Sequence, residues 1–266
     1  MTVVAFASVK GAPGVTTAAC LVGATWPAER NVVVAECDSS GGDLAARFEL
    51  SSKCGWSSLA TASRRSHSPP GLRPHLQQLP GGLDVLVGSS TTSTTSTSSI
   101  GTDAGPASVA ALLASATSDP ECPWDLLIDL GRVRPGGPDP GARAWLDRSD
   151  VVAVVLRTDA ASALHVRDRA PDLLARCEDR VGLVVVTTDH YPSAEIERFT
   201  GLPVIGEIPF DPVAATVAAG GHGSRRRLSR SSLATSARRL ATTLVAEGPR
   251  PGPEPRLGIS CQAAAP

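Results

Sequence analysis

The first chemically informative segment of the chain is a glycine-rich turn that follows an apolar run. Residues 2–17 read TVVAFASVKGAPGVTT, so that the apolar run leads into glycines and ends in two threonines. Glycines let backbone N–H groups approach an anion closely, and the start of a following helix adds the positive end of its dipole. The hydroxyl of Thr16 is a suitable ligand for Mg²⁺. This order of residues predicts a phosphate-binding turn between a strand and a helix.

The turn departs from the usual pattern, G-x-x-x-x-G-K-[ST], at the position of the lysine. Val15 stands there, and a different lysine, Lys10, lies at the start of the turn. Lysine occurs only at positions 10 and 53, while 23 other basic residues are arginine. A compact ammonium kept in an arginine-rich chain makes Lys10 a candidate phosphate ligand. Val15 leaves a second interpretation open, in which this is a tight turn on a fold that has lost its ligand.

Two further apolar runs end in carboxylates. The run VVVAECD ends with Glu36 and Asp38, two residues apart, and the run WDLLID ends with Asp129. Because ligands bind at the carboxyl ends of parallel strands in open α/β sheets, we expect Asp38 and Asp129 to converge on the turn. Phosphoryl chemistry needs such a turn, a Mg²⁺ partner and a carboxylate that orients the attacking water. Acids at strand ends are also common as helix caps and turn formers.

The surrounding sequence predicts an α/β fold that positions these groups. Strand-like runs rich in Val, Leu and Ile alternate with alanine-rich helical stretches. This pattern favours a doubly wound, mostly parallel sheet with helices on both faces. The predicted strands are Val3–Ala7, Asn31–Glu36, Leu83–Val87, Leu126–Leu130, Val151–Leu156, Gly182–Thr187 and Val204–Ile208. The predicted helices are Thr16–Thr25, Gly42–Phe48, Pro106–Ser115, Ala142–Arg148, Ser162–Cys177, Ala194–Thr200 and Ser229–Glu247.

Two segments interrupt the alternation. Residues 89–99 are eleven consecutive Ser or Thr, which predict a surface loop because they cannot bury apolar area. Residues 248–266 are rich in Pro and Gly and predict a disordered tail. We therefore expect one domain over residues 1–247.

Composition restricts the other classes of function. The net charge is −1, which offers no global electrostatic reason to bind nucleic acid or acidic lipid. Six cysteines are scattered without a C-x-x-C pair, and the five histidines show no metal-ligand spacing. No apolar run approaches the length of a transmembrane segment, so a reduced, cytoplasmic location is expected.

Taken together, these motifs resemble the MinD/ParA group of deviant-Walker P-loop ATPases, which includes the CpaE and TadZ proteins of pilus assembly. The segment KGAPGVTT at residues 10–17 is similar to that family's K-G-G-x-G-K-T-T, and ECDSSGGDL at 36–44 resembles its D-x-D segment. LPVIGEIPFD at 202–211 is similar to the family's last strand and adenine-side loop, where Pro209 and Asp211 lie. The resemblance covers about residues 1–246.

The resemblance implies ATP and Mg²⁺ as ligands and a homodimer assembled around the nucleotide. It implies a slow ATPase or a switch that places a septum, chromosome, plasmid, or pilus or secretion machine with the help of a protein partner. Lys10 would contact the partner's phosphates and Asp38 would orient the attacking water. The implied phosphate loop consists of Lys10, Gly11, Ala12, Pro13, Gly14, Val15, Thr16 and Thr17, and the implied Mg²⁺ set of Thr16, Asp38 and Asp129.

Several departures from the family pattern keep alternatives open. Val15 removes the lysine that acts within one subunit, and Pro13 removes an N–H donor. Loss of one charge-assisted contact costs about 1.5–3 kcal/mol, enough to weaken binding ten- to a hundredfold. A non-hydrolysing scaffold that recruits partners without nucleotide is therefore an alternative, as is a metabolic P-loop enzyme such as a synthetase. Thr187 and Thr188 stand where relatives often place an asparagine for the base, which leaves base specificity open.

A group of arginines surrounds the last predicted helix. One interpretation is a solvated outer face, and the other is a basic patch for DNA or a protein partner. The arginines are Arg225, Arg226, Arg227, Arg230, Arg238 and Arg239.

Overall fold

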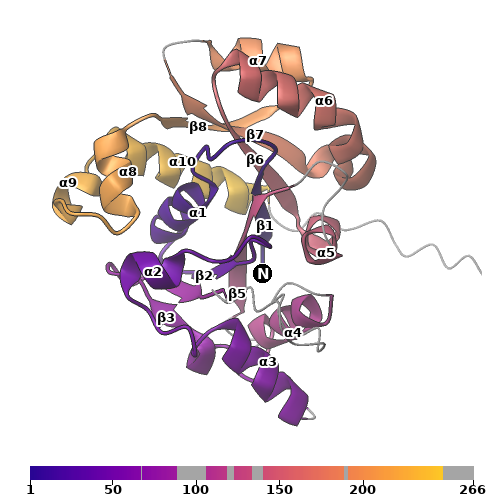
Figure 1. The fold of residues 1–266 in the computed structure, drawn as a ribbon, viewed down its shortest axis with the longest axis vertical. Coiled ribbons are helices and arrows are strands. Elements are labelled where there is room, and N and C mark those ends of the chain that lie inside the picture. The colour runs from indigo at the N-terminus through magenta and orange to yellow at the C-terminus, as the bar shows by residue number, and fades with distance from the viewer. Residues whose placement is uncertain (67, 89–105, 119–122, 134–139, 189–190, 248–266) are drawn as a thin grey trace, which may run out of the picture.

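A central eight-stranded sheet carries the fold (Figure 1). The computed structural model describes residues 1–66, 68–88, 106–118, 123–133, 140–188 and 191–247. The strand order is β3-β4-β2-β5-β1-β6-β7-β8, and all neighbouring strands run parallel except β3 and β4. The strands are β1 (Val3–Ser8), β2 (Asn31–Glu36), β3 (Gln77–Gln78), β4 (Asp84–Leu86), β5 (Trp124–Arg132), β6 (Val151–Arg157), β7 (Val181–Thr187) and β8 (Val204–Pro209).

Helices cover both faces of this sheet, as Figure 1 shows. One layer consists of α1 (Val15–Ala24), α2 (Leu44–Phe48), α8 (Pro212–Ala218), α9 (Arg225–Leu228) and α10 (Ser232–Ala246). The other consists of α3 (Trp56–Arg65), α4 (Pro106–Ala116), α5 (Pro140–Arg148), α6 (Ala160–Cys177) and α7 (Ser193–Thr200). Two short 3₁₀ turns, Arg73–His75 and Glu178–Arg180, complete the described elements. The predicted doubly wound α/β class is confirmed.

The two helical layers explain why the strands read as continuous apolar runs. In β1, Val3 and Ala5 belong to the core on the α5 and α6 side, whereas Val4 and Phe6 belong to the core on the α1 and α10 side. A strand covered on both faces must be apolar at every position, unlike a strand with one solvated face. Most residues of these strands are therefore uninformative about function.

The register brings three strand ends together. Asp129 of β5 is opposite Phe6 of β1 on one side and opposite Glu36 of β2 on the other. The carboxyl ends of β1, β2 and β5 are therefore adjacent, which places the turn after β1 beside the acids at the ends of β2 and β5.

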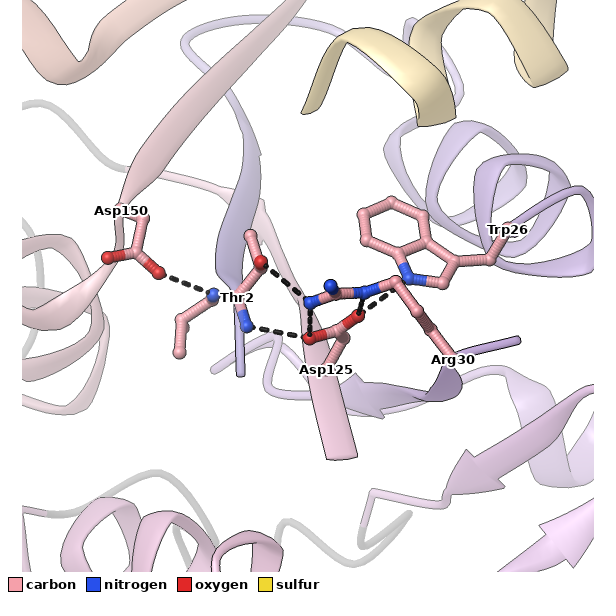
Figure 2. Close-up of polar contacts among 6 residues, drawn as sticks. Thr2, Trp26, Arg30, Asp125 and Asp150 are labelled. Carbon is pink, nitrogen blue, oxygen red and sulfur yellow. Dashed lines mark hydrogen bonds and ion pairs between the residues drawn. The ribbon is translucent and has the colours of Figure 1, made fainter. Parts of the chain in front are cut away.

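The opposite ends of β1 and β5 are held by an ion pair between the buried Asp125 and the part-exposed Arg30, drawn in Figure 2. The Asp125 carboxylate accepts hydrogen bonds from Arg30 at 2.5 and 2.7 Å, from the Trp26 indole at 2.8 Å and from the Thr2 backbone N–H at 2.7 Å. Burial raises the pKa of Asp125, but the hydrogen bonds from Arg30, Trp26 and Thr2 outweigh it and hold that pKa below its ordinary value. This cluster fixes the amino ends of the strands, far from the glycine-rich turn.

Some elements differ from the sequence-based expectation. The predicted helix Ser229–Glu247 begins only at Ser232, because Ser231 caps it by accepting a hydrogen bond from the Ala234 N–H. Residues Arg225–Leu228 form a separate helix, α9. The prediction lacked α3, α8, α9 and β3. Residues 89–99 and 248–266 lie outside the described residues. Among the described helices, none has the length and apolar character needed to cross a bilayer.

Candidate functional site

The turn between β1 and α1 has the backbone shape that its glycines predict. Gly11 and Gly14 have φ angles of 74° and 99°, in the left-handed region that glycine adopts without strain. Gly14 is the N-cap of α1, and no side chain of the described residues caps this helix. The first-turn N–H groups of α1 therefore lack a side-chain acceptor.

Val15 and Pro13 are both buried beside this turn. Val15 is 6% exposed and belongs to the hydrophobic core on the α1 side of the sheet. Pro13 is buried and Ala12 is exposed. The position that usually carries the P-loop lysine is thus filled by a core side chain.

Asp129 is the buried carboxylate of the site. It is 1% exposed, and its burial raises its pKa from 3.8 to about 6. The Thr16 hydroxyl and the Gly131 N–H, which is 2.9 Å from Oδ1, favour the charged form, whereas the charges of Glu36 and Asp38 oppose it. Oδ2 of Asp129 has no hydrogen bond of ordinary geometry to any described residue.

Asp38 lies against the same end of β5. A Cβ atom added to Gly131, whose φ is 57°, would lie 1.8 Å from Oδ2 of Asp38. The other oxygen, Oδ1, accepts a hydrogen bond of 2.7 Å from the Ser40 N–H in a tight turn. The absence of a side chain at Gly131 therefore lets the Asp38 carboxylate lie directly against β5.

The residues present fit Mg²⁺. A buried carboxylate oxygen without a partner, beside the Thr16 hydroxyl, is the kind of hard oxygen donor that Mg²⁺ prefers. No group of three or more His, Cys, Asp or Glu side chains in the described ranges could hold a metal alone. Mg²⁺ commonly takes one or two protein ligands and completes its shell with phosphate oxygens and water, and this donor set suits that mode.

Glu36 has a structural task instead. Its Oε1 accepts hydrogen bonds from the N–H groups of Asp43 at 2.6 Å and Leu44 at 2.9 Å, and its Oε2 accepts one from Gly88 at 3.0 Å. Burial raises the pKa of Glu36, and these three N–H groups lower it, with a net value above the ordinary one. With its oxygens bound to the backbone, Glu36 holds the segment after Asp38 in place.

Lys10 is exposed, and its ammonium lies 2.6 Å from Nε2 of His165 on α6. It therefore rests against its own subunit. This contact joins residues 155 positions apart, so sequence spacing offered no sign of it.

A cavity of about 140 Å³ adjoins the turn on the side of β7 and β8. Asp211 accepts a hydrogen bond of 2.8 Å from the Ala214 N–H and so caps α8. Thr188, near the predicted base position, is hydrogen-bonded to Thr158, with 2.9 Å between their hydroxyl oxygens. The sequence prediction lacked Arg157 and Phe210, which stack with 5.4 Å between the guanidinium carbon and the ring centre. The residues predicted for binding that line this cavity are Ala12, Pro13, Gly14, Thr17, Pro209 and Asp211.

The structure thus brings Thr16, Asp38 and Asp129 together and places Pro209 and Asp211 on an adjoining cavity. It leaves Lys10 outside this group. A signal for Arg157 was available, since it ends the apolar run of β6 just as Asp38 and Asp129 follow the apolar runs of β2 and β5.

Solved structures with the same architecture include a ParA family ATPase from Chlorobium tepidum TLS. It superposes with a TM-score of 0.71 at 19% identity, covering 91% of this chain and 97% of that chain. The MinD of the Aquifex aeolicus MinC:MinD complex has a TM-score of 0.67 at 14% identity, covering 94% of this chain and 98% of the other. The chain has the ParA/MinD fold.

Another ParA/MinD structure of this fold was solved with a bound nucleotide. MinD from Pyrococcus horikoshii OT3, complexed with Mg-ADP, has a TM-score of 0.63 at 15% identity, covering 90% of this chain and 94% of the other. At these identities the likeness establishes the fold. No protein-family model and no curated protein matches the sequence.

Proposed function

We propose that this chain binds ATP·Mg²⁺ at residues 10–17 and forms a homodimer around it. It would act in the cytoplasm as a slow ATPase or ATP-dependent switch in spatial organisation, such as chromosome or plasmid partitioning, septum-site placement, or placement of a pilus or secretion machine. One observation carries the proposal. The buried Asp129, with an uncommitted oxygen, lies beside Thr16 at the start of α1 and next to Asp38.

Each residue of the site has a distinct task in this proposal. The backbone around Gly11 and Gly14 donates N–H groups to phosphate oxygens, while Thr16 and Asp129 hold Mg²⁺ directly or through water. Asp38 orients the attacking water. When bound, Mg²⁺ neutralises charge on the phosphates.

Solved proteins of this fold support the proposals that the chain binds a nucleotide and a protein partner. MinD of Pyrococcus horikoshii OT3 was solved with Mg-ADP, and a plasmid partition protein of Borrelia burgdorferi B31 was solved with AMPPNP. The Aquifex aeolicus structure is a complex of MinD with MinC. We extend nucleotide binding and a protein partner to this chain on the strength of the site.

Isothermal titration calorimetry with ATP tests the proposal, in the presence and absence of Mg²⁺. We expect binding that strengthens with Mg²⁺ and loses this dependence in Asp129→Asn. A matched control is Asp172→Asn, which alters an exposed aspartate on α6. Absence of heat at millimolar ATP·Mg²⁺ would overturn the ATP-switch proposal.

A second candidate is a scaffold that dimerises and recruits partners without nucleotide. Burial of Val15 in the core favours it, because no cation stands at the usual lysine position. Sedimentation with and without ATP·Mg²⁺ separates the two candidates. A dimer that forms equally well without nucleotide, in a protein that shows no calorimetric heat, identifies the scaffold.

A further inference from the structure

We infer that Arg157 supplies, from the same subunit, the positive charge toward the nucleotide phosphates that the chain lacks at Val15. This inference rests on the proposed nucleotide site. Triphosphates are strongly anionic, and an arginine can bind phosphate oxygens in a bidentate manner through its planar guanidinium.

Arg157 begins in the right place. It is the last residue of β6, and β6 pairs in parallel with β1, the strand that leads into the turn. Its side chain therefore leaves the sheet at the same carboxyl edge from which the phosphate-binding turn rises.

Arg157 lines the same cavity as the turn. Arg157, Gly14 and Thr17 all line the cavity of about 140 Å³ beside α1. The other ionisable side chain on this wall is Asp211, which is already engaged as the cap of α8. Arg157 is therefore the cationic member of the cavity wall as the described residues define it.

The guanidinium of Arg157 has no acidic partner among the described residues. Its guanidinium stacks over Phe210, and within the described ranges it makes neither an ion pair nor a side-chain hydrogen bond. Stacking on a ring orients an arginine while its N–H groups stay available to an anion. Lys10, in contrast, already lies 2.6 Å from His165.

Calorimetry on the full chain tests this role, with ATP·Mg²⁺ and with tripolyphosphate·Mg²⁺, which has no base. Arg157→Met keeps an apolar stem against Phe210 but removes the charge, whereas Arg157→Lys keeps the charge. We expect Arg157→Met to weaken both ligands about ten- to a hundredfold and Arg157→Lys to recover part of the loss. Arg198→Met is the matched control, because Arg198 is an exposed arginine of α7 that does not line this cavity.

The outcomes separate this inference from the proposed function. If the wild-type protein binds ATP·Mg²⁺ and Arg157→Met binds it within twofold, the inference is wrong and the proposed function stands. If Arg157→Met weakens ATP but not tripolyphosphate, Arg157 contacts the base instead, which also overturns the inference. A wild-type protein that binds neither ligand overturns both.

Discussion

The Lys10 ammonium lies 2.6 Å from Nε2 of His165, so the lysine that the family resemblance places across a dimer interface rests on its own α6. An ammonium can only donate, and His165 must therefore accept through an unprotonated Nε2. A role for Lys10 in the partner's site requires this contact to break.

Removing His165 should consequently favour the dimer. A net hydrogen bond is worth about 0.5–1.5 kcal/mol, so His165→Ala should strengthen ATP-dependent dimerisation roughly two- to tenfold. Lys10→Ala should weaken it. Sedimentation equilibrium measures both, with exposed His222→Ala as control. An unaltered profile for Lys10→Ala excludes its role across the interface.

The raised pKa of Asp129 predicts how stability depends on pH. The folded protein holds a proton on Asp129 up to a pKa of about 6, whereas the unfolded chain releases it near 3.8. The folded state binds more protons between these values, so this group lowers the free energy of unfolding by about 2.4 kcal/mol as pH rises from 4 to 7.

Asp129→Asn should therefore be more stable than the wild type at pH 7, by on the order of 1–3 kcal/mol, and nearly equal to it at pH 4. Urea unfolding at both pH values checks this. If the variant is less stable than the wild type at pH 7, the charged Asp129 does not destabilise the ligand-free folded protein.

Gly131 should be intolerant of a side chain because Asp38 occupies the adjacent space. Gly131→Ala should lower the free energy of unfolding by about 2–4 kcal/mol, since the new Cβ would lie 1.8 Å from Oδ2 of Asp38. Gly71→Ala, where a Cβ meets nothing within 4 Å, should be nearly neutral.

The double variant Asp38→Ala/Gly131→Ala isolates this contact. Removing the carboxyl group should restore part of the loss, which a double-mutant cycle measures as a coupling energy. Strict additivity of the two substitutions would mean that Asp38 does not lie against Gly131.

Asp125 should contribute to the stability of the fold and not to the affinity for nucleotide. Asp125→Ala leaves the Trp26 indole and the Thr2 N–H without their acceptor and removes the partner of the part-exposed Arg30, so the free energy of unfolding should fall by about 2–4 kcal/mol. Because the pKa of Asp125 is lowered in the fold, its contribution is present above pH 4 and is lost as pH falls through the folded pKa. ATP affinity should be unchanged by calorimetry, and a large change would place the nucleotide elsewhere.

The arginines of α9 and α10 offer a test for DNA binding. All six are exposed, and none makes an ion pair with a described residue. Neutralising residues 225–227 together should weaken binding of a random-sequence duplex and lower its salt dependence by about one unit per arginine that contacts phosphate. Fluorescence anisotropy at two salt concentrations measures this.

The matched control for that test is the ion-paired set on α6: Arg167, Arg169 and Arg176. Equal losses in both triple variants would indicate a general charge effect. Absence of wild-type binding at low salt would identify the arginines as a solvated face.

The sequence was informative where the physics is local. Apolar runs predicted the strands that form most of the sheet, and acids at two run ends predicted the site near Thr16. The Ser- and Thr-rich α3 was missed because only two of its residues, Trp56 and Leu59, are buried, and Ser and Thr are weak helix formers. The cap and first residue of α8, Asp211 and Pro212, were a local signal that the prediction assigned to a loop instead.

Other features depend on contacts between distant parts of the chain. His165 meets Lys10 and Phe210 meets Arg157 only after the sheet has formed. The sequence showed Glu36 only as an acid at the end of an apolar run, and its acceptor role depends on the N–H of Gly88, 52 residues away. No spacing rule along one segment reveals such pairs.

The carboxylate of Glu36 joins two stretches of backbone that the chain itself keeps apart. One oxygen accepts hydrogen bonds from the start of α2, just beyond the Asp38 turn. The other accepts one from Gly88, just after the neighbouring strand β4. A displacement of the backbone at residue 88 is therefore coupled to the Asp38 turn through the Glu36 side chain. Replacing Glu36 with a longer or shorter side chain would let the two stretches of backbone move independently. The orientation of the Asp38 carboxylate would then change with them.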